Sequence, residues 1–213
     1  MSEMIENTSV SESELVTEEK RPNYLLQAWL VIFLSALYGA ILVWVQMSLS
    51  EKIEANKKNA TFAQIPSLVK GAEPSKTQEL AITGTDGKPA RVYQVFNADG
   101  AHIGWVFPGL GQGFSDVISV IIGLDADVKT ITGLYVLDQK ETPGLGNFIQ
   151  DEPFRSQFVG KATTPSLAVV KSEPVAENEI LALTGATISS KAVSDLVNAT
   201  VARYRDAAIE AAK

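Results

Sequence analysis

The stretch "DVISVIIGLDADVKTITGLYVLD", residues 116–138, has the pattern of two β-strands joined by a tight turn. Its two halves, Asp116–Asp125 and Lys129–Asp138, carry β-branched residues at about half of their positions, which favours strands over helices. The residues "ADV" between them predict a short connection. The stretch therefore predicts one strand pair of the folded part of the chain.

Further elements lie on both sides of this pair. Upstream, Ala90–Phe96 and Ala101–Phe107 are β-rich and flank "NADG", a hairpin signal. Downstream, Ser166–Ser172 predicts a fifth strand, and Asp151–Gly160 predicts a short helix with Pro153 near its first turn. A C-terminal helix is predicted by apolar residues at i, i+3 and i+4 spacing: Ala192, Val193, Leu196, Val197, Val201, Tyr204 and Ala208. Strand pairs and helices without β–α–β alternation predict an α+β fold.

An uncharged apolar run lies far upstream, at Ala28–Val45. About 20 such residues cross the hydrocarbon core of a bilayer as a helix. Aromatic side chains near the two ends, Tyr24, Trp29 and Trp44, are typical of membrane interfaces. We therefore expect one retained transmembrane helix over residues 24–49.

The rest of the chain divides around this helix. Residues 1–23 are acidic, rich in serine and poor in aromatic residues, which predicts a disordered tail. Residues 50–79 are expected to form a polar helix and a connector, with Ile65–Gly71 in the connector, and residues 80–213 a folded domain. Lysine and arginine flank both ends of the span, so the positive-inside bias does not choose its orientation.

Composition excludes several classes of function. The formal net charge of −7 argues against a nucleic-acid surface, and we predict no nucleic-acid partner. The chain has no cysteine and a single histidine, His102. Disulfides, thiolate metal sites and clusters of histidine ligands are thereby removed. No role is assigned to His102, and neither a catalytic residue nor a metal ligand is predicted.

Two glycine-rich segments are candidate sites. "GLGQG", Gly109–Gly113, lacks a following Lys-Ser/Thr and opens no helix, so a tight loop is favoured over phosphate binding. "DQKETPGLGNF", Asp138–Phe148, follows a strand and contains Pro143, Gly144 and Gly146. Such a loop could lie against a planar ligand with Leu145 as an apolar contact, or it could be a plain turn.

The third candidate is "LTGATISS", Leu183–Ser190, which precedes the C-terminal helix. The start of a helix presents unpaired N–H groups and the positive end of its dipole, which together bind phosphate. Gly185 and Ala186 leave space for close approach, and the Thr187 hydroxyl would lie near such an anion. The alternative is that Ser189 or Ser190 merely caps the helix.

These features together resemble the FMN-binding domain family, which includes the G subunit of the Rnf electron-transport complex and its relative, the C subunit of the Na⁺-translocating NADH:quinone reductase. A single span precedes the domain, "GLYVLDQKETPGLG" resembles the strand-then-ETPGLG loop of the family, and "LTGATISS" resembles its [S/T]-G-A-T motif. The resemblance implies an antiparallel sheet with helices in an extracytoplasmic FMN-binding domain. It also implies that FMN is covalently attached to Thr187 through a phosphoester.

The resemblance implies the remaining assignments as well. The cofactor-binding residues would be Thr184, Gly185, Ala186, Thr187, Glu141, Thr142, Pro143, Gly144, Leu145 and Gly146. The chain would be a redox subunit of a membrane ion-translocating ferredoxin:NAD⁺ oxidoreductase, without substrate turnover of its own. It would lie in the bacterial inner membrane with residues 1–23 in the cytoplasm. Its partners would be other membrane subunits and, during maturation, a flavin transferase.

One position departs from the family pattern. The family usually has Asp six residues before the acceptor threonine, whereas this chain has Leu181 there, and the nearest upstream acid is Glu179. Two alternatives therefore stay open: a flavin that is bound non-covalently, and a membrane-anchored assembly domain of the same fold without flavin. Membership of the C-subunit group of the reductase is a further alternative.

Overall fold

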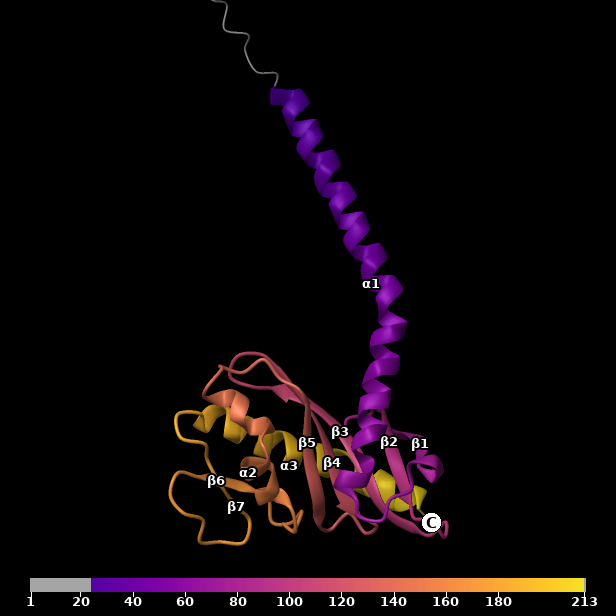
Figure 1. Cartoon of the computed structure of the whole chain (residues 1–213), viewed down its shortest axis with the longest axis vertical. Coiled ribbons are helices and arrows are strands. Elements are labelled where there is room, and N and C mark those ends of the chain that lie inside the picture. The colour runs from indigo at the N-terminus through magenta and orange to yellow at the C-terminus, as the bar shows by residue number, and fades with distance from the viewer. Residues whose placement is uncertain (1–23, 213) are drawn as a thin grey trace, which may run out of the picture. The chain divides into compact units, whose positions relative to one another are not determined.

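The structure of this chain is a computed structural model that describes residues 24–212 (Figure 1). The predicted tail, residues 1–23, lies outside the described residues. The chain divides between Lys52 and Ile53 into two compact units. The first helix, α1 (Tyr24–Leu68), contributes residues to both units.

The first unit holds the apolar part of α1. Within the described residues, Ala28–Ser50 is the one stretch that is long and apolar enough to cross a membrane. It contains no charged residue, and none of it is buried by the rest of the chain. The predicted apolar helix is thus confirmed as a helix, and its side chains are free to contact lipid.

The second unit is built on an antiparallel sheet in which every strand pairs with the next along the chain. The strands are β1 (Gln78–Thr83), β2 (Pro89–Phe96), β3 (His102–Gln112), β4 (Val117–Asp125) and β5 (Ile131–Asp138). Residues 116–138 form the paired strands β4 and β5, as predicted, and the "NADG" hairpin joins β2 to β3. The β1 strand was not predicted, and β3 runs on to Gln112.

The C-terminal helix α3 (Thr187–Ala211) covers one face of the sheet (Figure 1). Its predicted apolar stripe is confirmed, because Val193, Val197 and Val201 are almost fully buried in the main core. Alternating strand residues such as Trp105 and Phe107 point to the same core, as the two-residue period of a strand requires. The predicted α+β class, an antiparallel sheet with helices, is confirmed.

The last turns of α1 cover the opposite face of the sheet. Ile65, Leu68 and Val69 are buried there against strand residues that include Val106 and Ile121. The prediction of a connector beginning at residue 65 is therefore wrong, because Pro66 lies inside the helix and the apolar residues around it have a sheet to pack on. The sheet is thus covered on both faces.

Short elements fill the segment between β5 and α3. They are η2 (Gly146–Gln150), α2 (Glu152–Arg155), η3 (Ser156–Phe158), β6 (Ala168–Val170) and β7 (Glu179–Leu181), and a further short turn, η1 (Pro74–Lys76), precedes β1. The helix predicted over Asp151–Gly160 is split into α2 and η3. The predicted fifth strand exists as β6, but it pairs in parallel with β7 instead of joining the main sheet.

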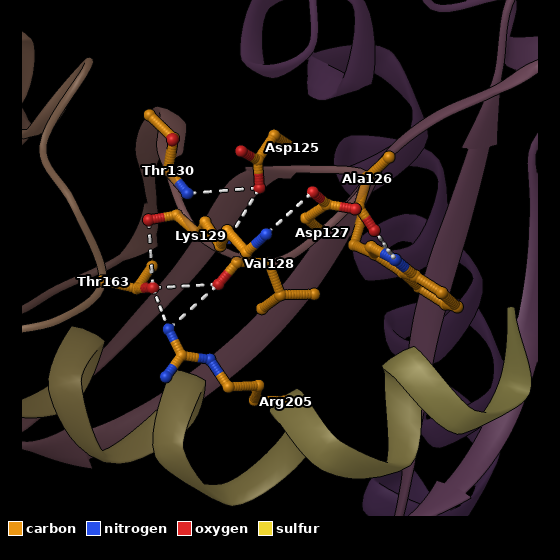
Figure 2. Close-up of polar contacts among 9 residues, drawn as sticks. Asp125, Ala126, Asp127, Val128, Lys129, Thr130, Thr163 and Arg205 are labelled. Atoms are coloured by element: carbon orange, nitrogen blue, oxygen red, sulfur yellow. Dashed lines mark hydrogen bonds and ion pairs between the residues drawn. The ribbon is translucent and has the colours of Figure 1, made fainter.

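The β4–β5 turn is tied to α3 by polar contacts (Figure 2). Val128 has a φ of 57°, which is rare for a β-branched residue, and its side chain is fully buried. Its carbonyl oxygen accepts hydrogen bonds from Thr163 Oγ1 at 2.8 Å and Arg205 Nη2 at 3.1 Å, and Asp125 Oδ1 accepts one from the backbone N–H of Thr130 at 3.1 Å. The Arg205 bond ties the turn to α3, the Thr163 bond ties it to the segment between η3 and β6, and the Asp125 bond closes the turn itself.

Candidate functional site: the loop after β5 and the start of α3

Helix α3 begins at Thr187, and the residue before it, Ala186, is its N-cap. The N-cap alternative for Ser189 or Ser190 is wrong, because both residues lie inside the first turn. The helix start has no side-chain cap among the described residues. The first N–H groups of a helix have no intrahelical acceptor, so this end can hold an anion close to the Thr187 side chain.

A tight turn brings the chain to this helix start. Gly185 has a φ of +78°, a conformation that favours glycine, and the backbone N–H of Ala186 donates to Leu183 O at 3.0 Å. Ser190 Oγ accepts a hydrogen bond from the Leu183 N–H at 3.0 Å and donates to Ala186 O at 2.9 Å. Ser190 therefore shapes the turn from within the helix.

The loop after β5 is folded back on itself. Thr142 O accepts hydrogen bonds from the backbone N–H groups of Leu145 at 3.2 Å and Asn147 at 3.3 Å. Gly144 has a φ of +77°, and Thr142, Pro143, Gly144 and Leu145 are all exposed. The loop thus presents backbone and the side chains of Thr142, Pro143 and Leu145 to solvent.

Glu141 joins this loop to the start of α3. Its carboxylate is buried, with a relative exposure of 4%, and accepts hydrogen bonds from Ser189 Oγ at 2.5 Å and from the Ser115 N–H at 3.0 Å. Ser189 is 48 residues away in sequence and is itself buried. Glu141 therefore connects three segments: the loop after β3, the loop after β5 and the first turn of α3.

Glycine makes this close approach possible. A Cβ atom on Gly146 would lie 2.7 Å from Ser189 Oγ, and one on Gly113 would lie 2.4 Å from Glu141 Oε1. A Cβ atom on Gly185 would lie 2.8 Å from Leu145 Cδ2. All three separations are shorter than van der Waals contact. A larger residue at any of these positions would require the neighbouring side chain to move.

A cleft of about 540 Å³ opens where the segments meet, and we refer to it as the Thr187 cleft. Its volume falls in the usual range for cofactor sites. Phe114 and Ile188 are 60% and 59% exposed, so the cleft has an unusually apolar rim. The lining residues are Phe114, Thr142, Leu145, Gly146, Gly185, Ala186, Thr187, Ile188 and Ser189.

The structure brings most of the predicted site residues together here. Of the predicted residues, Thr184, Pro143, Gly144 and Glu141 do not line the cleft. Glu141 lies beneath it as a support. Phe114, Ser115 and Ser189 were missed as site residues. Ser189 belongs to the "LTGATISS" segment. Phe114 and Ser115 carry no sequence signal, because only the folded sheet brings them to the Thr187 cleft.

Neither Leu181, at the family's Asp position, nor the nearest upstream acid lines the cleft. Leu181 ends β7 with its backbone held by the Gln157 side chain, whose Oε1 accepts the Leu181 N–H at 2.7 Å. Glu179 Oε2 accepts the N–H groups of Val175 and Ala176 at 2.7 and 3.1 Å, and these bonds lower the pKa of Glu179. The Glu179 carboxylate is thus committed to its own loop.

The "GLGQG" segment and His102 have structural partners, and so does Lys191, which directly follows "LTGATISS". The tight loop predicted for "GLGQG" is wrong, because residues 109–112 belong to strand β3 and pair with β4. A Cβ atom on Gly109 would lie 2.7 Å from Thr200 Oγ1, so glycine lets β3 approach α3. His102 Nε2 lies 3.0 Å from Gly104 O, and burial lowers the pKa of its ring. Lys191 forms an ion pair with Asp195 one turn along α3. No group of three potential metal ligands occurs within residues 24–212.

Comparison with known proteins places this geometry in a family. The family model described as "FMN-binding domain" matches residues 113–202, which include the whole Thr187 cleft. The chain is 33% identical over 162 residues to the G subunit of the Na⁺-translocating ferredoxin:NAD⁺ oxidoreductase complex of Acetobacterium woodii. That alignment covers 72% of this chain and 77% of the relative. The chain belongs to the FMN-binding domain family.

Other relatives match smaller parts. The G subunit of the ion-translocating oxidoreductase complex of Methanosarcina acetivorans is 33% identical, with 56% of this chain and 64% of the relative covered. The C subunit of the Na⁺-translocating NADH-quinone reductase of Vibrio vulnificus is 31% identical, with 57% of this chain and 52% of the relative covered. Against this C subunit, the chain spans about half of the relative's length.

Two solved structures share the fold. The crystal structure of Shewanella oneidensis NqrC has a TM-score of 0.52 at 24% identity, covering 59% of this chain and 62% of that one. The crystal structure of the C subunit of the Na⁺-translocating NADH-quinone reductase from Parabacteroides distasonis has a TM-score of 0.51 at 28% identity, covering 58% and 64%. The sheet and helices described above are thus the fold of this family.

Proposed function

We propose that the chain is the flavin-bearing electron-transfer subunit of a membrane ion-translocating oxidoreductase, with FMN esterified to Thr187. The observation that carries the proposal is the Thr187 cleft, where both motifs meet at an uncapped helix start. The names of the G-subunit relatives, and the family model that covers the cleft, support the same function.

The residues present fit FMN. The uncapped start of α3 offers N–H donors for a phosphate, and Gly185 and Ala186 leave its approach clear. Leu145, Phe114 and Ile188 provide exposed apolar surface of the kind that a flavin ring would cover. When bound, FMN supplies reversible electron transfer, and the surrounding protein tunes its potential.

Attachment would use the Thr187 hydroxyl as the nucleophile. Thr187 Oγ1 would hold the flavin phosphate as a phosphoester, formed in exchange for the phosphoanhydride bond of an activated flavin nucleotide, and the hydroxyl proton would leave with the departing phosphate or solvent. A flavin transferase would carry out this step. The ester keeps the cofactor at a high effective concentration in a compartment where free FMN is scarce.

The proposal extends to the membrane. The span Ala28–Ser50 anchors the chain in the bacterial inner membrane, with residues 1–23 in the cytoplasm and the FMN-binding domain outside it. Neighbouring membrane subunits would donate and accept the electrons, and they would also move the ion, because one helix cannot form a channel. Membership of the G-subunit group is supported by the 77% coverage of the Acetobacterium relative, against 52% for the Vibrio C subunit.

A second candidate function follows from Leu181. If the transferase requires a carboxylate at that position, the chain would be an anchored assembly domain of the same fold without flavin. Two observations support this alternative. Leu181 is 37% exposed, and the Glu179 carboxylate accepts hydrogen bonds from its own loop instead of taking the place of the missing Asp.

Intact-mass analysis separates the two candidates. The full chain, co-expressed with a flavin transferase, is compared with Thr187→Ala and with Thr83→Ala, an exposed threonine of β1. We expect the wild type and Thr83→Ala to carry an added mass equal to FMN less one water, and Thr187→Ala to lack it. Masses that match the unmodified sequences for both the wild type and Thr187→Ala would support the assembly domain.

A further inference from the structure

A second cavity lies away from the Thr187 cleft, between β2 and β3. These two strands pair from Tyr93↔Val106 up to the "NADG" turn. Residues 89–92 of β2 are not paired with residues 107–112 of β3. A cavity of about 440 Å³ occupies the region where the strands separate, and we refer to it as the β2–β3 cavity. It shares no lining residue with the Thr187 cleft.

The interior of this cavity is largely apolar and its walls come from several elements. Helix α3 contributes Leu196, Ala199 and Tyr204, and the lower part of α1 contributes Thr61. Three cationic side chains are also part of the lining: Lys58, Arg91 and Arg203. An apolar interior with clustered cations matches an amphiphile that has an anionic head group.

The described lining of the cavity carries these three cations and no carboxylate. Glu79 and Asp86, which form ion pairs with these cations, are not among the described lining residues. Lys58 and Arg91 both contact Glu79, with Arg91 Nε 3.4 Å from Glu79 Oε1, and Arg203 Nε donates to Asp86 Oδ1 at 2.9 Å. An anion inside the cavity would therefore meet three cationic side chains, and no carboxylate occurs among the described residues that line it, in a chain whose overall charge is −7.

Few residues separate the cavity residue Lys58 from the candidate membrane span, and a membrane contains such amphiphiles. Lys58 follows the end of the candidate span, Ser50, by eight residues. Even a fully extended chain of that length reaches only about 29 Å, whatever path it takes. Lys58 therefore cannot lie further than this from the end of the span.

We propose that the β2–β3 cavity binds one anionic phospholipid from the membrane that holds the chain's own span. The phosphate lies among Lys58, Arg91 and Arg203, and an acyl chain enters the space between the separated strands. Bound lipid would fix the second unit near the membrane surface, which would limit the distance that electrons must cross to a membrane partner. The binding itself does not depend on flavin.

Photo-crosslinking of the full chain in lipid nanodiscs tests this proposal. The discs contain phosphatidylcholine and a small fraction of phosphatidylglycerol with a photoactivatable acyl chain, and adducts are mapped by peptide mass spectrometry. We expect adducts on the α3 peptide that contains Ala199. Arg203→Gln should lower their yield about fivefold, because one cation near an anionic surface contributes about 1 kcal/mol.

Matched variants on α3 provide the control. Ala199→Trp fills the cavity and should abolish the α3 adducts, whereas Ala202→Trp, at an exposed position that does not line the cavity, should keep them. Thr187→Ala should keep them too, which separates this result from the outcome for flavin. Adducts confined to residues 24–52, equal adducts in Ala199→Trp, or equal labelling by a photoactivatable phosphatidylcholine would overturn the proposal.

Discussion

Glu141 has hydrogen-bond partners in two different segments, so its side chain supports the Thr187 cleft without lining it. Replacement with leucine leaves the buried Ser189 hydroxyl and the Ser115 N–H without their acceptor. We expect Glu141→Leu to lower the free energy of unfolding by about 2–4 kcal/mol, and Glu141→Gln, which keeps an acceptor oxygen, to lower it by about 1 kcal/mol. Urea denaturation in detergent measures both.

A double-mutant cycle isolates the hydrogen bond between Glu141 and Ser189. Glu141→Leu combined with Ser189→Ala should cost less than the sum of the single changes, by on the order of 1 kcal/mol, because the two side chains share one hydrogen bond. Glu177→Gln, at an exposed position, is the control and should change the unfolding energy by less than about 0.5 kcal/mol. Simple additivity would contradict the role given to Glu141. Flavin occupancy should fall with Glu141→Leu and recover with Glu141→Gln.

Gly185 meets two constraints at once, a positive φ and contact with Leu145. Gly100 has a similar φ of +84° but has open space where a Cβ atom would lie. Alanine at either position should cost about 1 kcal/mol of backbone strain. Only Gly185→Ala should also displace the loop after β5 and reduce flavin attachment, as followed by in-gel fluorescence. Equal attachment in the two variants would show that the Gly185–Leu145 contact is unimportant.

At the scale of elements, the sequence pattern predicted those strands and helices whose residues carry a strong local signal. β2, β4, β5 and α3 were found because their β-branched content or helical period is strong. β1 was missed because "QELAIT" is a polar edge strand whose alternation is weak. The last turns of α1 were missed because Pro66 and Gly71 indicate a connector, and only the sheet face explains the burial of Ile65 and Leu68. The Glu141–Ser189 contact, across 48 residues, has no local signal at all.

The packing of α1 on the sheet depends on two glycines. A Cβ atom on Gly133 would lie 2.8 Å from Leu68 Cα, and one on Gly123 would lie 2.8 Å from Leu68 O. Because the obstructing atoms include backbone, the helix must shift to accommodate a methyl group. We expect Gly133→Ala to lower the unfolding free energy by about 1–3 kcal/mol.

Thr83→Ala on β1 serves as the control for that experiment and should change stability by less than about 0.5 kcal/mol. Hydrogen exchange should localise the effect of Gly133→Ala to residues 61–69. An unchanged unfolding energy, with unchanged exchange in that segment, would mean that the end of α1 does not need the close approach.

For the whole molecule, the absence of cysteine makes the proposed orientation directly testable. Ser172→Cys places one thiol at an exposed position of the second unit, and Ser9→Cys places one in residues 1–23. A membrane-impermeant maleimide should label Ser172→Cys in spheroplasts and should label Ser9→Cys only after permeabilisation. The opposite pattern would place the flavin domain in the cytoplasm and remove the reason given for a covalent tether.

The central claim is that Thr187 carries the flavin, and peptide mapping tests it most directly. Trypsin should release residues 172–191 as one peptide, because no lysine or arginine lies between Lys171 and Lys191. Fragmentation of that peptide from chain matured with a flavin transferase should place the mass of FMN less one water on Thr187, and on no other hydroxyl. Flavin mass on Thr184 or a serine, or an unmodified peptide from fully matured chain, would contradict the account.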